Sequence, residues 1–217
     1  MAVEMRVLKS REDWLENRKP GLGGSEIAAV IGCNPYMDNV TLWEQKTGRR
    51  EREDISDKPF VQYGTQAEMH LRGLFRLDFP EYSVEYVDHN SWTNSKYPWA
   101  KASLDGWLRD QDGRLGVLEI KTTNILQSMQ KEKWRDRIPD NYYCQCLFYM
   151  AVVEAEFCIL KAQLKTEFSS TPYLQTKHYH INRSDVQADI DYLMSEGERF
   201  WGYVQRDERP PLRLPNI

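Results

Sequence analysis

The sequence predicts an α/β fold in which a mixed β-sheet is flanked by helices. Two observations support this prediction: apolar residues recur at helical spacing in several segments, and other segments alternate apolar and polar residues as strands do. The order is helices, a group of strands, a helix, further strands and a final helix, which is typical of mixed α/β domains. The length of 217 residues suits one domain, so we expect residues 1–217 to form a single unit.

Three short helices are expected first. Ser10 to Arg18 begins with a serine at the N-cap position and ends at a glycine-rich stretch. Ser25 is then placed to cap a second helix that stops at Gly32. Thr41 to Gly48 forms the third helix and is closed by its own glycine. The charged segment 49–58 that follows is expected to be a solvated loop.

A longer helix and a group of strands are expected next. Gly64 to Phe79 has helical apolar spacing and would carry Glu68 on its first turns. Strands are predicted at Tyr82 to Asp88, Trp99 to Leu108 and Gly116 to Lys121. The last two would form a hairpin, because turn-forming residues occupy positions 110–113 between them.

The second half of the chain predicts two more helices with strands between them. Asp140 to Val153 has helical apolar spacing, whereas Phe157 to Leu164 and Gln175 to Ile181 are typical of strands. Ser184 is the expected N-cap of the final helix, which carries a long apolar stripe. That helix must end before the proline pair at 210–211, because proline cannot continue it.

Composition indicates a globular chain with a well-solvated surface, since 41% of residues are hydrophobic and 29% are charged. The net charge of -4 argues against a protein that coats DNA through a bulk positive field, but a nuclease with a local basic groove remains compatible with it. No apolar run reaches the length of a membrane helix and no signal-peptide core is present, so we expect a cytoplasmic protein without a membrane partner.

The four cysteines are expected to be buried or half-buried free thiols. They lack the paired spacing of a zinc site, and a cytosolic chain is not expected to carry structural disulfides. Their positions are Cys33, Cys144, Cys146 and Cys158.

The segment Gly116 to Lys121 carries the strongest chemical signal. Alternate residues of a strand share a face, so Glu119 and Lys121 project to one side, while Leu118 and Ile120 project to the other. A carboxylate and an ammonium on one face of a buried strand are costly unless each has a partner. A metal ion would be such a partner for the carboxylate.

Asp105, just ahead of a glycine on the neighbouring strand, supplies a second carboxylate that can converge with Glu119 across the hairpin. Two carboxylates repel unless a cation lies between them, and oxygen ligands suit Mg²⁺ or Mn²⁺ rather than zinc. Lys121 would then help to position a water and to offset phosphate charge. Alone, this pattern is weak, because a strand with Glu and Lys two residues apart usually marks a solvated face.

Further segments extend the pattern over nearly the whole chain. They are Trp14 to Arg18, Gly21 to Ile27, Gly32 to Tyr36, Leu42-Trp43, Lys46 to Arg49, Tyr63 to Glu68, Ser103 to Gly106, Leu118 to Lys121 and Pro139 to Gln145. On these segments the chain resembles the phage-type alkaline exonucleases, the lambda exonuclease and YqaJ-like recombinases of the PD-(D/E)xK nuclease superfamily. The resemblance implies a restriction-endonuclease-like sheet. Leu104 stands where the superfamily signature has proline, but only the carboxylate that follows it would contact metal.

The resemblance also implies a role for each site residue. Asp105, Glu119 and the backbone carbonyl of Ile120 would bind Mg²⁺, with Mn²⁺ able to substitute, and Glu68 would complete or hydrogen-bond that shell. Lys121 and Gln145 would orient the attacking water. The DNA phosphate would be held by Arg18, Ser25 and Tyr142.

Simpler interpretations stand beside several of these roles. Ser25 could be a plain N-cap, Arg18 a solvated helix-end residue and Glu68 a first-turn glutamate favoured by the helix dipole. Tyr142 could be a core aromatic. Gln145, in contrast, lies among apolar residues and needs a specific partner for its amide.

As a function, the resemblance implies a Mg²⁺-dependent exonuclease that degrades one strand of linear double-stranded DNA from its 5′ end to 5′-mononucleotides, in phage-type recombination. It further implies a homotrimer and a single-strand annealing protein as partner. Three alternatives stay open: an endonuclease of the same fold that needs no DNA end, a catalytically silent DNA-binding module, and an iron–sulfur nuclease. The cysteine spacing does not match the last.

Overall fold

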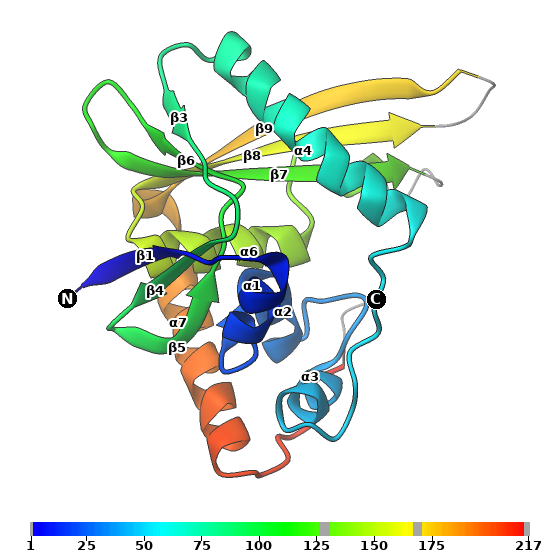
Figure 1. Ribbon diagram of the computed structural model, residues 1–217, viewed down its shortest axis with the longest axis vertical. Coiled ribbons are helices and arrows are strands. Elements are labelled where there is room, and N and C mark those ends of the chain that lie inside the picture. Colours follow the sequence, from blue (N-terminus) through cyan, green and yellow to red (C-terminus); the bar gives the residue numbers. More distant parts are fainter. Residues whose placement is uncertain (1, 126–130, 167–170, 215–217) are drawn as a thin grey trace.

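The computed structural model of the protein describes residues 2–125, 131–166 and 171–214. Within these ranges the chain forms two β-sheets with helices packed around them (Figure 1). The larger sheet has the strand order β3-β6-β7-β8-β9, and the smaller sheet has the order β1-β4-β5-β2. The predicted α/β class, a mixed sheet flanked by helices, is confirmed.

The larger sheet is built around two long central strands that run parallel to each other. Its strands are β3 (Ser83–Glu85), β6 (Gly106–Arg109), β7 (Leu115–Ile125), β8 (Phe157–Thr166) and β9 (Tyr173–Asn182). The helix α6 (Asp140–Val153) lies between β7 and β8 in sequence and provides the crossover that a parallel pair requires. The β6–β7 hairpin is antiparallel, as predicted.

The smaller sheet was not predicted as a separate unit. Its strands are β1 (Val3–Val7), β2 (Leu22–Gly23), β4 (Asn90–Asn94) and β5 (Tyr97–Ala102). The single strand expected from Trp99 to Leu108 is therefore wrong, because the chain divides there between β5 and β6, which belong to different sheets. At the break, the buried Asn90 side chain donates to the Leu104 carbonyl at 3.0 Å and accepts from the Leu104 N–H at 2.8 Å, so a side chain satisfies that backbone.

The first helices start at residues other than those predicted, except for α1 (Arg11–Arg18), which Ser10 caps as expected. Ser25 is not the N-cap of α2 (Gly24–Val30): Gly23 occupies that position, and the Glu26 carboxylate accepts its N–H at 2.8 Å. The helix α3 (Asn39–Lys46) begins before Thr41, because Asp38 caps it.

The two longest helices also begin earlier than predicted. α4 (Pro59–Asp78) starts with a proline, a residue suited to the first helical position because no intrahelical bond is lost there. Glu68 is therefore near the middle of α4 and not on its first turns. α7 (Arg183–Gln205) has Asn182 as its N-cap, so Ser184 lies inside the helix.

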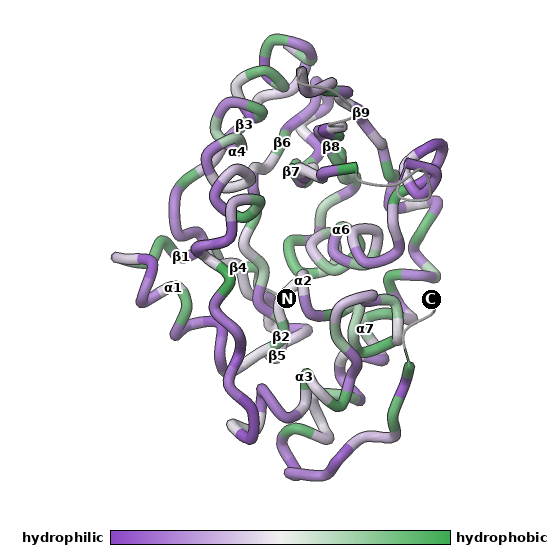
Figure 2. The backbone as a smooth tube through the Cα atoms, turned by 90° about the vertical axis from the view of Figure 1, so that its right-hand side faces the viewer, coloured by the Kyte–Doolittle hydropathy of each residue, from purple (hydrophilic) through white to green (hydrophobic). Residues whose placement is uncertain are grey.

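The two faces of the larger sheet are covered by different helices. α4 packs Leu71 and Phe75 against Leu118 and Ile120 of β7 on one face. α6 covers the other face and is itself enclosed by α2, α7 and the smaller sheet (Figure 2). Every residue of α6 from position 144 to 153 is buried, which accounts for its apolar character on all sides.

Two expectations from composition can be compared with this fold. Cys144, Cys146 and Cys158 are buried free thiols and Cys33 is a half-buried one, as predicted. Among the helices in the described ranges, none combines the length and the apolar character needed to span a bilayer.

Candidate functional site

Glu119 and Lys121 of β7 project together toward α6. The Glu119 side chain is 1% exposed, and its Oε1 lies 2.5 Å from the Lys121 Nζ. Leu118 and Ile120 point to the opposite face, into the cluster with α4. The alternation predicted from sequence is therefore confirmed, and each of the two charged groups has the other as a partner.

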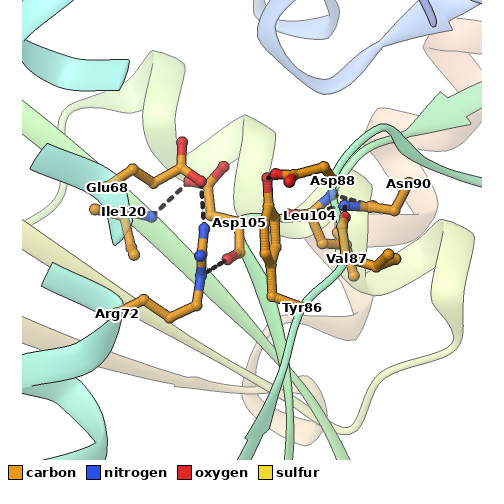
Figure 3. Close-up of polar contacts among 9 residues, drawn as sticks. All are labelled: Glu68, Arg72, Tyr86, Val87, Asp88, Asn90, Leu104, Asp105 and Ile120. Carbon is orange, nitrogen blue, oxygen red and sulfur yellow. Dashed lines mark hydrogen bonds and ion pairs between the residues drawn. The ribbon is translucent and has the colours of Figure 1, made fainter. Parts of the chain in front are cut away.

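Asp105 meets β7 at an edge that β6 leaves open. The pairing of β6 with β7 ends at Gly106 opposite Leu118. Beyond that point the Asp105 Oδ2 accepts the Ile120 N–H at 2.8 Å (Figure 3). The N–H and C=O of one strand residue point to the same edge. The Ile120 carbonyl is therefore directed to the same side as the Asp105 carboxylate.

Glu68 reaches this edge from α4 together with Arg72, a residue that the sequence interpretation missed. Arg72 donates from Nη2 to the Glu68 Oε1 and from Nε to the Asp105 carbonyl, both at 2.5 Å. Its guanidinium stacks on the Tyr86 ring, 3.4 Å from the ring centroid (Figure 3). The signal that could have found Arg72 is its position four residues after Glu68, where side chains of a helix meet.

Gln145 joins the site from α6. Its Nε2 donates to the Glu119 Oε1 at 2.7 Å and to the Tyr149 hydroxyl at 3.0 Å, which supplies the specific partners that its apolar surroundings required. Tyr149, four residues further along the helix, was also missed. The close packing of α2 on α6 depends on Gly24, since a Cβ there would lie 2.4 Å from the Tyr149 ring.

Arg18 and Ser25 lie next to each other and line the same cleft as Asp105 and Gln145. The Arg18 Nη2 donates to the Ser25 Oγ at 3.3 Å, and the guanidinium packs over the Trp14 ring at 4.6 Å from its centroid. Because Gly23 caps α2, the Ser25 hydroxyl is not used as a cap. The first turn of α2 is held in place by the buried Glu26, whose carboxylate lies 2.8 Å from the Lys46 ammonium.

Most of the predicted site residues line a single cleft of about 400 Å³. The cleft contains five of them: Arg18, Ser25, Glu68, Asp105 and Gln145. Glu119 and Lys121 lie behind Gln145, since the Gln145 amide binds the Glu119 carboxylate and that carboxylate binds the Lys121 ammonium. Tyr142 does not line this cleft. Its ring lies on the far side of Lys121, 5.3 Å from the Nζ, and lines a neighbouring pocket.

The carboxyl groups are held in an environment that disfavours their charged forms. Burial, with repulsion from Asp105, raises the pKa of Glu119 to about 8. Burial and the same neighbour raise the pKa of Glu68 to about 7. The pKa of Asp105 is also raised, mainly by burial. Burial alone would lower the pKa of Lys121, but the carboxylates of Glu119 and Asp105 raise it. The site therefore has a deficit of positive charge.

The donor set fits a hard divalent cation. The Glu119 Oε2 is buried and has no hydrogen-bond partner, which is costly unless a further group binds it. No three His, Cys, Asp or Glu side chains gather as a metal-ligand set within the described ranges. The carboxylates of Asp105 and Glu119 and the Ile120 carbonyl could hold such a cation, with water and phosphate filling the remaining positions. Mg²⁺ is commonly bound in this way.

The fold is that of the alkaline exonucleases. The chain superposes on the crystal structure of the alkaline exonuclease LHK-Exo from Laribacter hongkongensis with a TM-score of 0.66 at 18% identity, over 90% of this chain and 93% of that one. A phage-related exonuclease from Haemophilus somnus 129PT gives a TM-score of 0.52 at 10% identity, over 86% of this chain and 96% of that one.

Sequence comparison defines the family. Residues 13–156 match the model of the YqaJ-like viral recombinase domain, which covers more than half of the chain. The chain therefore belongs to the YqaJ-like viral recombinase domain family, as its motifs predicted. It is 26% identical over 151 residues to the uncharacterized protein YqaJ of Bacillus subtilis (strain 168), covering 68% of this chain and 44% of that protein. The chain thus spans less than half of the length of this relative.

Proposed function

We propose that the protein is a Mg²⁺-dependent exodeoxyribonuclease that degrades one strand of linear double-stranded DNA in the 5′-to-3′ direction and releases 5′-mononucleotides. The observation that carries the proposal is the buried, unpartnered Oε2 of Glu119 beside Asp105, with Lys121 and Gln145 on the other carboxylate oxygen. LHK-Exo, which has a similar fold, has been crystallised in complex with dAMP, a 5′-mononucleotide. That complex supports the proposed class of product.

The carboxylates of Asp105 and Glu119 and the Ile120 carbonyl would hold the metal. When bound, Mg²⁺, or Mn²⁺ in its place, lowers the pKa of water and neutralises charge on the phosphate. Gln145 and Lys121 orient the attacking water from the α6 side, because both already bind the Glu119 Oε1. Glu68 acts from the opposite side as a hydrogen-bond acceptor whose position Arg72 holds.

Arg18 and Ser25 would bind the terminal 5′-phosphate. A guanidinium offers two parallel donors to a phosphate, and the Ser25 hydroxyl adds a third beside the free N–H groups of the first turn of α2. Both side chains line the cleft that contains Asp105. Tyr142, beyond Lys121, would contact the phosphate chain on the other side of the scissile bond.

The biological setting is part of the same proposal. The family is named for viral recombinases, so we propose a role in phage-type recombination, with DNA ends as substrate and a single-strand annealing protein as partner. We further propose that residues 1–217 act as a single nuclease domain, that copies of the chain assemble as a homotrimer, and that the enzyme acts in the cytoplasm of a bacterial or phage-infected cell.

The experiment compares two DNA substrates of identical sequence, an end-labelled linear duplex and a closed circle. Each is incubated with Mg²⁺ or with EDTA, using wild-type protein and the variants Lys121→Ala and Lys161→Met. Lys161 is a matched control, since it is a buried lysine opposite Ile120 on β8 whose side chain binds Asp78 on the α4 side, away from the site. We expect loss of the linear substrate with Mg²⁺, as labelled 5′-mononucleotide, by wild type and Lys161→Met alone.

Other results would contradict the proposed exonuclease and favour one of the alternatives. Cutting of the closed circle would indicate an endonuclease, and activity of Lys121→Ala equal to wild type would contradict the proposed centre. If neither substrate is cleaved with Mg²⁺ or Mn²⁺, the silent DNA-binding module is the correct interpretation. A purified protein that is coloured by a cluster would indicate the iron–sulfur alternative.

A further inference from the structure

A second pocket adjoins the candidate active site on the far side of Lys121. Its walls include Tyr36, Trp134 and Tyr142, and Lys133, Arg137 and Asp140 also line it. Thr123 forms part of its floor and follows Lys121 by two residues on the same face of β7. The Lys121 Nζ lies 5.3 Å from the ring of Tyr142, so a lining residue of this pocket is in contact with the ammonium that pairs with Glu119. We call this second cavity the aromatic pocket.

The walls of the aromatic pocket are held in place by their own contacts. Trp134 is 2% exposed, and its ring centroid lies 5.5 Å from that of Tyr142 with an interplanar angle of 30°. Its carbonyl accepts hydrogen bonds from the Lys177 ammonium and from the Tyr179 hydroxyl, the latter at 2.6 Å. The aromatic surface is therefore formed before any ligand arrives.

Tyr36 is the exposed member of the pocket. Its side chain is 85% exposed, although its backbone is fixed, since its N–H donates to the buried Asn34 side chain at 2.9 Å. A single exposed aromatic residue needs no explanation. An exposed ring at the mouth of a pocket lined by two further aromatic side chains, with two basic side chains against one acidic one, is suited to a flat ligand that carries negative charge. The Gly32 to Tyr36 motif has no other role in the proposed chemistry.

We infer that the aromatic pocket stacks the base of the first nucleotide on the 3′ side of the scissile phosphate, after that nucleotide has separated from the duplex. This inference rests on the proposed function. The 5′-terminal nucleotide occupies the cleft with Arg18 and Ser25, so the strand that continues past Lys121 toward Tyr142 is the 3′ side. Tyr142 precedes Gln145 by three residues of α6, so the two side chains lie on the same face of the helix about one turn apart.

A nucleotide that has separated from the duplex has lost its base stacking, and an aromatic face compensates for that loss. Stacking on aromatic side chains tolerates every base, because each base has a π-face. An enzyme that removes successive nucleotides without regard to sequence needs a contact of this kind.

The first test is kinetic. Tyr36→Ala should raise the KM for a short linear duplex about tenfold, equivalent to about 1.4 kcal/mol, with kcat within about twofold of wild type. Tyr36→Phe should keep the wild-type KM, because it keeps the ring. Tyr192→Ala, which removes a 54% exposed tyrosine on α7, is the matched control and should change neither constant. Thermal melting of each variant reports whether the fold is intact.

The second test locates the base directly. Duplexes that carry 5-iododeoxyuridine at the first, second or third nucleotide from the 5′ end are bound with Ca²⁺ in place of Mg²⁺, irradiated in the near ultraviolet and digested for mass spectrometry. We expect crosslinking to Tyr36 from the second nucleotide and its loss in Tyr36→Ala. Crosslinking from the first or third nucleotide instead, or bound DNA without crosslinks to the pocket, would overturn the inference.

Failure of the inference is distinguishable from failure of the proposed function. Wild-type protein that does not degrade linear DNA with Mg²⁺ contradicts the function itself. Wild-type protein that degrades linear DNA, together with Tyr36→Ala kinetics equal to those of Tyr192→Ala, contradicts only the stacking role.

Discussion

The substitution Gly24→Ala tests whether the close packing of α2 on α6 holds the candidate site in place. A Cβ at position 24 would lie 2.4 Å from Cε1 and 2.7 Å from Cζ of Tyr149. Carbon atoms pack at about 3.5–4.0 Å, so the ring must move by roughly 1 Å. Tyr149 is buried and accepts a hydrogen bond from Gln145, so this movement also displaces the Gln145 amide.

The expected effects of Gly24→Ala follow from these distances. Overpacking costs about 1–3 kcal/mol, and replacing glycine in a helix returns about 0.5–1 kcal/mol, so the midpoints of the two ranges leave a net loss of roughly 1 kcal/mol. For a chain of this size the Tm should fall by about 2–4 °C. A misplacement of about 1 Å can reduce a catalysed rate about 100-fold, so hydrolysis of linear DNA should fall toward that level.

Thermal melting and single-turnover hydrolysis of labelled duplex measure the two effects. Gly73→Ala in α4 is the matched control, because no atom lies within 4 Å of its Cβ position. That variant should gain about 0.5–1 kcal/mol and keep wild-type activity. The reasoning is refuted if Gly24→Ala melts at or above the wild-type temperature, or if its activity matches that of Gly73→Ala.

Three further predictions concern charged groups. Lys161→Met should leave the Tm unchanged or raise it, whereas Asp78→Ala should lower it. Only Asp78→Ala leaves the buried Lys161 ammonium without its carboxylate partner. The Tm of both variants is measured by calorimetry. Arg72→Met should lower the free energy of unfolding by about 3 kcal/mol and reduce activity, since the Glu68 carboxylate loses its ion pair. Urea unfolding measures this change, and equal midpoints for the variant and the wild type would contradict it. In EDTA, the free energy of unfolding should fall as pH rises from about 5 to 8. Burial and the neighbouring Asp105 raise the pKa of Glu119 to about 8 in the folded protein. Over this pH range the folded protein therefore keeps a proton that the unfolded chain has released, and rising pH favours unfolding. Saturating Mg²⁺ should reduce this slope and Glu119→Gln should weaken it, as melting curves across this pH range would show; a slope of opposite sign in EDTA would count against the raised pKa.

Features that depend on neighbouring residues were predicted well. The bounds of α6 agree with the expectation at both ends, and the hairpin of β6 and β7 follows from the turn at 110–113. The shared face of Glu119 and Lys121 follows from strand alternation alone. Each of these properties is determined by a period or a turn within a few residues, and no distant contact overrides it.

Features that depend on distant partners were missed. The strand β1 is paired with β4, about 90 positions away in the chain, and β4 itself contains mostly polar residues whose pattern indicates no strand. The break at Ser103 to Asp105 depends on the Asn90 side chain. The N-cap of α2 is Gly23 rather than Ser25, because Glu26 accepts the Gly23 N–H and is in turn bound by Lys46 from α3.

By itself, the sequence determined the α/β class, the family and the identities of the residues proposed for the site, because these follow from local periodicity and from motifs that are continuous in the chain. Only the tertiary structure decided that Asp105 meets Ile120 at an open sheet edge, that Arg72 and Tyr149 hold Glu68 and Gln145, and that Tyr142 belongs to a second, aromatic pocket. The physical reason is that these arrangements depend on how α4 and α6 pack on opposite faces of β7, and such packing is determined by contacts between segments far apart in sequence.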